Sequence, residues 1–99
     1  MEKSAHSKLY VPILERLRAM RHAAGMTTRG LAAKLSTVHT VVTKAEMGER
    51  RLDLLELYRF CIACNQPPDK VAADLMREIQ SLEASPQLGR KKPRKPRKK

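Results

Sequence analysis

Aromatic residues are scarce in this chain: its 99 residues include one phenylalanine, two tyrosines and no tryptophan. Leu, Val, Ile, Met and Ala must therefore supply any buried core. At this length we expect a single domain, which is too small to enclose a substrate cavity of enzyme size. The sequence also offers no nucleophile–base pair, no metal-ligand set and no phosphate-binding loop. We therefore do not expect an enzyme, a cofactor or a small-molecule substrate.

Long apolar runs are also lacking, so we expect no membrane-spanning segment. Residues 1–6 have no apolar core of a signal peptide, which makes a cytoplasmic location the default expectation. The only cysteines, Cys61 and Cys64, are then expected to stay reduced. They form a CxxC motif, but a redox motif of this kind belongs at a helix N-terminus after a strand. No second CxxC or histidine pair completes a zinc site, so buried core thiols are the favoured interpretation and no metal is expected.

Acidic residues are the minority, and the formal net charge is +11, which points to a polyanionic partner. Eight of these charges lie in residues 90–99, so the rest of the chain carries only +3. Residues 85–99 cannot bury apolar surface and are expected to form a disordered tail. The tail could contact DNA phosphates, bind RNA or another acidic partner, or only aid solubility. Nucleic-acid contact is favoured, because such charge raises nonspecific affinity and its salt dependence. The charged residues are Arg90, Lys91, Lys92, Arg94, Lys95, Arg97, Lys98 and Lys99.

Apolar residues recur at three- and four-residue spacing, and no strand pattern or internal repeat is evident. After a flexible stretch at residues 1–9, residues 10–84 are predicted to form one all-α domain of five helices. Capping signals divide the helices: Gly25 ends the first, Thr27 caps the second, Gly48 stops the third, and an Asp53–Glu56 capping box opens the fourth. The fifth follows Pro67-Pro68 and ends before Ser85-Pro86.

Each predicted helix has an apolar face. The apolar face of the first helix consists of Tyr10, Ile13, Leu14, Leu17, Met20 and Ala24, and that of the second, which runs through Leu35, of Leu31, Ala32 and Leu35. The third helix, roughly Val38 to Met47, is expected to turn Val42 and Ala45 inward, and the fourth Leu54, Leu57, Tyr58, Cys61 and Ile62. The fifth helix carries Val71, Leu75, Ile79 and Leu82 on one face.

Residues 27–48 are predicted to form a helix-turn-helix unit, with Ser36 and Thr37 in the turn. Such a unit lays its second helix across the major groove of DNA. Val41 could pack on a thymine methyl group, or it could be partly buried in the core. His39 could contact a base, or it could simply be an exposed helix residue. The outward residues expected to reach bases or phosphates are His39, Thr40, Val41, Thr43 and Lys44.

The stretch from Ile13 to Val71 resembles the Xre family, the phage repressor and Cro type of helix-turn-helix regulator. The resemblance rests on five motifs in order: Leu17-Arg18-Ala19-Met20-Arg21, Gly25-Met26-Thr27, Leu31-Ala32-Ala33-Lys34-Leu35, Thr43-Lys44-Ala45-Glu46-Met47-Gly48 and Glu49-Arg50-Arg51-Leu52-Asp53.

The resemblance implies a lambda-repressor-like domain in which Arg21 and Glu46 form a buried structural pair. It places Thr28 where the family usually has a phosphate-contacting Gln; Thr donates the same hydrogen bond but reaches less far. Arg50 and Arg51 match backbone-contacting positions, although a solvated loop is the alternative. The DNA-binding set implied is Thr27, Thr28, Thr37, His39, Thr40, Val41, Thr43, Lys44, Arg50 and Arg51.

The expected function is a sequence-specific regulator of transcription that binds double-stranded DNA in the bacterial cytoplasm or nucleoid. By resemblance, it is expected to be a small repressor of phage or mobile-element type, autoregulatory, and homodimeric on a palindromic operator. The fifth helix and its Leu82 end are a candidate dimer surface. The alternative is an antitoxin or protein-interaction module that binds a partner protein and, secondarily, its own operator.

Overall fold

The computed structural model describes residues 8–84, which fold into five α-helices and contain no strand. The helices are α1 (Val11–Ala23), α2 (Thr28–Lys34), α3 (His39–Met47), α4 (Leu54–Ala63) and α5 (Pro68–Glu83). The prediction of an all-α, five-helix domain is therefore confirmed. None of the helices in this range is long and apolar enough to cross a membrane.

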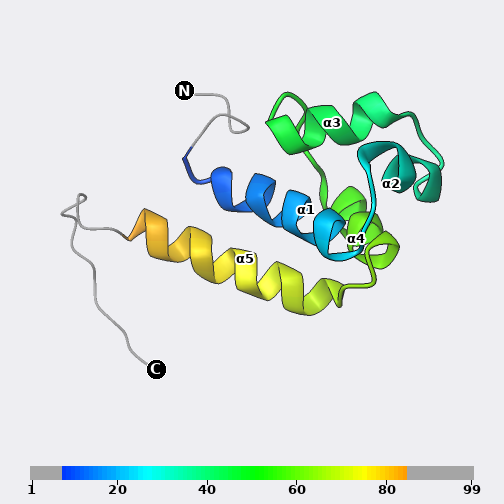
Figure 1. Cartoon of the computed structure of the whole chain (residues 1–99). Coiled ribbons are helices and arrows are strands. Elements are labelled where there is room, and N and C mark those ends of the chain that lie inside the picture. Colours follow the sequence, from blue (N-terminus) through cyan, green and yellow to red (C-terminus); the bar gives the residue numbers. More distant parts are fainter. Residues whose placement is uncertain (1–7, 85–99) are drawn as a thin grey trace.

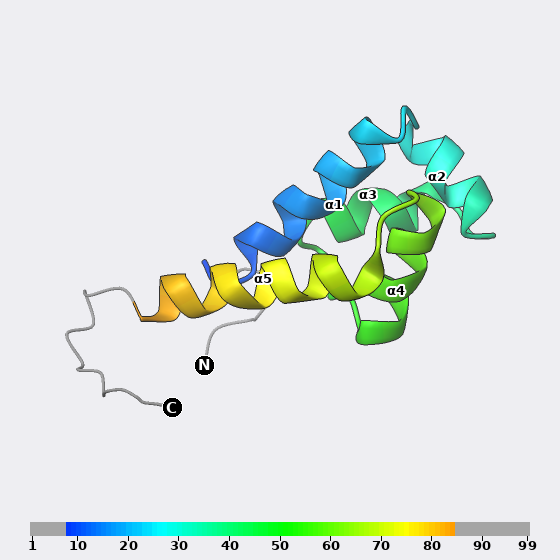
Figure 2. The same cartoon turned by 90° about the horizontal axis from the view of Figure 1, so that it is seen from below.

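Helix α1 forms the middle of the domain, with α3 on one side and α5 on the other (Figure 1). Helix α2 packs against α3, while α4 packs against the first part of α5 (Figure 2). Leu17 of α1, Leu31 of α2 and Val42 of α3 are fully buried at the centre of the core. Cys61 of α4 and Val71 of α5 complete it, so every helix contributes to one cluster.

Local sequence signals set most helix ends. Gly25 and Gly48 follow α1 and α3 with φ of +71° and +79°, in the left-handed region that a side chain disfavours. The Oγ1 of Thr27 accepts a hydrogen bond from the Gly30 N–H at 3.0 Å and caps α2. Asp53 and Glu56 form both halves of the predicted capping box at the start of α4. The structure therefore confirms these predicted helix ends. Each of them depends only on residues a few positions apart, which is why the sequence alone could predict it.

The predicted inward face of α4 is wrong in part. Cys61 is buried and Leu57 is half-buried, but Leu54, Tyr58 and Ile62 are exposed. Phe60 and the neighbouring Cys64 take the core positions instead. The periodicity misled because the apolar residues of α4 cover one broad arc of the helix, and spacing alone does not say which part of that arc meets the core.

The apolar face of α5 is buried only toward its start. Val71 and Leu75 are buried and Ile79 is half-buried, whereas Leu82 near the end is exposed.

Candidate nucleic-acid interface

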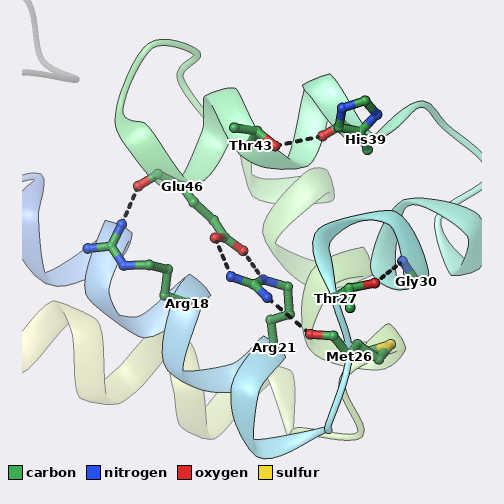
Figure 3. Close-up of polar contacts among 8 residues, drawn as sticks. All are labelled: Arg18, Arg21, Met26, Thr27, Gly30, His39, Thr43 and Glu46. Atoms are coloured by element: carbon green, nitrogen blue, oxygen red, sulfur yellow. Dashed lines mark hydrogen bonds and ion pairs between the residues drawn. The ribbon is translucent and has the colours of Figure 1, made fainter.

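An ion pair between Arg21 and Glu46 fastens α3 to α1 (Figure 3). The Arg21 Nε lies 2.7 Å from one Glu46 carboxylate oxygen and Nη2 lies 3.0 Å from the other, so the pairing is bidentate. The Arg21 Nη1 also donates to the main-chain oxygen of Met26 at 3.0 Å, in the turn that leads to α2. One guanidinium therefore connects α1, the α1–α2 turn and α3.

Burial makes this pair important for the position of α3. Glu46 is only 4% exposed, and it is the one buried charged residue among those described. The hydrogen bonds with Glu46 raise the pKa of Arg21. Arg18 adds a second link from α1 by donating to the main-chain oxygen of Glu46 at 2.8 Å. Because charge-assisted, bidentate bonds are strong and directional, α3 is held in one orientation from its C-terminal half.

The N-terminal half of α3 is open by comparison. Its N-cap residue, Val38, has no side chain able to accept a hydrogen bond and is 62% exposed. The first N–H groups of α3 therefore have no side-chain cap, and such groups, at the positive end of the helix dipole, favour a phosphate oxygen. Thr40 and Lys44 are exposed and His39 is half-buried on the same helix.

Thr43 differs from the other predicted contact residues. It is half-buried, and its hydroxyl donates to the main-chain oxygen of His39 at 3.1 Å, one turn earlier in α3 (Figure 3). The hydroxyl oxygen is still able to accept a hydrogen bond, but its proton is used inside the helix.

The other threonines predicted to contact DNA lie at the start of α2 and in the turn before α3. Thr27 uses its hydroxyl oxygen as the cap of α2 and remains exposed, while Thr28 is half-buried. Thr37 is exposed directly before α3. Ser36, with φ of +58°, makes the reversal between the two helices in the left-handed region. The exposed hydroxyl groups of Ser36 and Thr37 therefore directly precede the open end of α3.

Val41 lies in a hollow rather than on the outermost surface of α3. The hollow has a volume of about 180 Å³ and is lined by Leu35, Thr37 and Phe60 among others. Val41 is half-buried there, which fits the alternative of partial burial better than contact with a base.

Arg59 of α4 lines the same hollow and was not predicted as a site residue. Its side chain is exposed and makes no ion pair within residues 8–84. A cation free of internal partners, beside Thr37 and Val41, suits a phosphate that approaches α3 from this side. The one feature of the sequence that could have indicated a role for Arg59 is that no other residue of α4 is basic.

Arg50, after α3, is already engaged inside the protein. It lies 2.6 Å from the Glu56 carboxylate, and the pair is partly exposed. The hydrogen bond from Arg50 lowers the pKa of Glu56, and the same bond raises the pKa of Arg50. Since Glu56 also closes the α4 capping box, Arg50 links the loop after α3 to α4. Arg51 is exposed in the same loop. The basic residues at positions 90–99, which are predicted to contact nucleic acid, lie outside the described residues.

A solved structure resembles the domain closely: an XRE-family like protein from Pseudomonas syringae pv. tomato str. DC3000. The two share 35% sequence identity and superpose with a TM-score of 0.69. The match covers 76% of this chain and 92% of the other. No protein-family model and no curated protein matches the chain.

Proposed function

Because this chain belongs to the XRE family of helix-turn-helix proteins, we propose that it binds duplex DNA at specific sequences and regulates transcription. The simplest mode is repression, in which the bound protein covers a promoter, including its own. Helix α3 enters the major groove, and the groups at its open N-terminal end contact bases and phosphates.

The arrangement of α3 supports this proposal most directly. Its C-terminal half is fixed from inside by Arg21 and Glu46. On its outer side Thr40 and Lys44 are exposed, and His39 is half-buried at its first position. A helix held rigidly on one side and polar on the other suits direct reading of base edges.

The predicted contact residues are assigned either to base edges or to phosphates, according to the length of each side chain and the hydrogen bonds that it already makes. His39 and Thr40 are assigned to base edges, and Lys44 to a guanine or a phosphate. Phosphate contacts are assigned to three threonine hydroxyls, to the open N-terminus of α3 and to three arginines. The hydroxyls are those of Thr27 and Thr28 at the start of α2 and of Thr37 in the turn, and the arginines are Arg50, Arg51 and Arg59.

We further propose that the basic residues at 90–99 supply sequence-independent affinity. Their +8 charge exceeds the +3 of the rest of the chain. Counterion release from phosphates makes such binding steeply salt-dependent while adding no sequence choice. Specificity would then come from α3 and much of the affinity from residues beyond the domain.

Selection of bound sequences from random DNA tests the proposal. We expect the full chain and a chain ending at Gln87 to enrich the same motif, with the shorter chain binding more weakly and with a shallower salt dependence. An inverted repeat in that motif would support a dimer on a palindromic operator. If neither chain enriches a motif at physiological salt, sequence-specific regulation is wrong.

Single substitutions then test the assigned roles. His39→Ala or Thr40→Ala should relax the motif at one position, with a loss of about 1–3 kcal/mol per base contact. Gln80→Ala, an exposed change on α5, is the matched control and should leave the motif intact. An unchanged preference in both α3 variants would move base reading to other residues.

The second candidate function is a protein-interaction module, such as an antitoxin that secondarily binds its own operator. Exposed apolar side chains on α4 favour it, since patches of this kind often mark protein contacts. Co-purification of a small protein in stoichiometric amounts would support this candidate.

A further inference from the structure

Tyr10 is a buried aromatic residue that stands apart from the central core. It is 8% exposed and directly precedes α1, where its main-chain oxygen accepts a hydrogen bond from the Ile13 N–H at 3.0 Å and starts the helix. Its side chain does not cap α1, and it is not part of the buried cluster to which every helix contributes. A buried tyrosine usually has a hydrogen-bond partner for its hydroxyl, so the place of that hydroxyl is informative.

The Tyr10 hydroxyl reaches the loop between α3 and α4, which comprises residues 48–53 and runs past α1 (Figure 1). The hydroxyl oxygen accepts a hydrogen bond from the Leu52 main-chain N–H at 2.8 Å, across 42 positions of the sequence. The Leu52 side chain is half-buried against the core, so this residue is held by both its side chain and its main chain. Tyr10 therefore ties the start of α1 to the α3–α4 loop.

Other hydrogen bonds of the α3–α4 loop are local. The Glu49 N–H donates to the main-chain oxygen of Lys44 in α3 at 2.9 Å. Toward the other end of the loop, the Arg50 side chain lies 2.6 Å from the Glu56 carboxylate of α4. These bonds fix the loop to the two helices that it connects, whereas the Tyr10 bond fixes where the loop lies relative to α1.

Helix α1 also holds α3, through Arg18 and Arg21. Arg21 pairs with the Glu46 carboxylate, and Arg18 donates to the Glu46 main-chain oxygen at 2.8 Å. One helix therefore fixes both the helix assigned to base edges and the loop whose arginines, Arg50 and Arg51, are assigned to phosphates. Duplex DNA sets the distance between a base edge and the flanking phosphates, so a protein that contacts both gains affinity when the two elements are held in one rigid frame.

We propose that Tyr10 is a positioning residue for DNA binding. Its hydroxyl holds the α3–α4 loop in the place where Arg50 and Arg51 meet the phosphates that flank α3. Tyr10 itself is buried and acts through the main chain of Leu52. This inference deepens the proposed function and rests on it, because the place of the loop matters for binding only when α3 lies in a major groove.

Tyr10→Phe isolates this one bond, because it removes the hydroxyl and keeps the ring. The loop then loses its tie to α1 and has to be ordered when DNA binds, at a cost in entropy. A single hydrogen bond contributes modestly, so we expect the affinity for the selected motif to fall by about three- to tenfold. The loss should be the same on an unrelated duplex, and the motif should not change, because phosphate contacts carry no sequence information.

Salt dependence separates a positioning role from a merely structural one. Each phosphate contact that is lost makes the slope of log affinity against log salt shallower by about 1. We therefore expect a shallower slope for Tyr10→Phe, measured at a temperature where circular dichroism shows both chains to be fully folded. If Tyr10→Phe melts earlier but binds with the unaltered affinity and slope, the role of Tyr10 is structural and the proposal is overturned.

Tyr58→Phe is the matched control, since it removes the hydroxyl of the other tyrosine. Tyr58 is 51% exposed on α4, and its hydroxyl makes no hydrogen bond within residues 8–84. This variant should keep the affinity, the motif and the salt slope of the unaltered chain. A loss in Tyr58→Phe equal to that in Tyr10→Phe would overturn the proposal, because the effect would then not depend on the Leu52 bond.

A double-mutant comparison tests whether Tyr10 acts through the loop arginines. Tyr10→Phe is placed in a chain that already carries Arg50→Gln and Arg51→Gln. We expect little further loss of affinity there, because the contacts that Tyr10 positions have already been removed. An equal loss in both backgrounds would overturn the assignment to the loop.

Hydrogen exchange of main-chain amides tests the bond itself without DNA. The Leu52 amide should exchange slowly in the unaltered chain and at least several-fold faster in Tyr10→Phe. The Glu56 amide, which donates to the Asp53 carboxylate at 2.8 Å, is the internal reference and should exchange equally in both chains. Equal acceleration of both amides would indicate general loosening, and unchanged exchange at Leu52 would mean that the bond is absent; either result overturns the proposal.

Failure of this inference is distinct from failure of the proposed function. If the unaltered chain selects no motif from random DNA, sequence-specific regulation is wrong and the role of Tyr10 falls with it. If the unaltered chain and Tyr58→Phe bind the motif and Tyr10→Phe binds it equally well, only the role of Tyr10 is wrong.

Discussion

Removing the Glu46 carboxylate should destabilise the domain more than any comparable change at its surface. In a Glu46→Ala variant, Arg21 loses both carboxylate bonds, of 2.7 and 3.0 Å, and keeps only its bond to the Met26 oxygen. The Arg21 side chain is only 12% exposed, so water replaces the lost partner poorly.

The magnitude follows from the cost of leaving a buried charge unpaired. Breaking a buried ion pair from one side costs about 3–5 kcal/mol. We expect about 3 kcal/mol here, because the Met26 oxygen still holds part of the guanidinium. A small domain has a free energy of unfolding of only about 5–15 kcal/mol. The melting temperature should therefore fall by more than about 10 °C.

Urea unfolding followed by far-UV circular dichroism measures this loss. Glu49→Ala, an exposed carboxylate just after α3, is the control and should change stability by less than about 0.5 kcal/mol. Replacing both partners, Arg21→Met with Glu46→Leu, should recover much of the loss because no charge is then left buried. A loss below about 1 kcal/mol in Glu46→Ala would refute the reasoning, since it would mean that the pair is hydrated in solution.

Three further predictions concern backbone strain, acid stability and thiol reactivity. Ser36→Gly should stabilise the domain by up to about 1 kcal/mol in thermal melts, because Ser36 has φ of +58°; destabilisation would show that its side chain has another role. The pKa of Glu56 is lowered by Arg50 below its ordinary value of 4.5, so the contribution of this pair is present above about that pH and is lost as the pH falls through the lowered pKa. The stability difference between the unaltered chain and Glu56→Gln should thus be under about 1 kcal/mol near neutral pH and should shrink in acid; a difference that grows in acid would contradict the assignment. Burial raises the pKa values of the Cys61 and Cys64 thiols, so a thiol reagent should react slowly at neutral pH and at the rate of unfolding; immediate reaction of both in the folded protein would disagree.

Features that depend on neighbouring residues could be predicted from the sequence. Thr27 can cap α2 wherever that helix packs, and the Asp53–Glu56 pair can cap α4 in the same way. Gly25 and Gly48 mark reversals that disfavour other residues, and their positive φ angles do not depend on the rest of the fold. The Arg21–Glu46 pair connects residues 25 positions apart, and it was inferred from family resemblance rather than from spacing.

Features that depend on how the helices meet could not be predicted in this way. No motif predicts the ion pair between Arg50 and Glu56, because only the packing of the loop after α3 against α4 brings these two side chains together. Arg59 carried no motif, and only the approach of α4 to the α2–α3 turn places it beside Thr37 and Val41.

The sequence by itself therefore determined the number of helices, their caps and the order of the helix-turn-helix unit, because these follow from short-range spacing and backbone preference. Only the tertiary structure decided which side of α4 is buried. Its apolar residues form one broad arc in the helical pattern, and which part of that arc is buried depends on how α4 packs against α5 and the rest of the core. That packing buries Phe60 and leaves Tyr58 exposed.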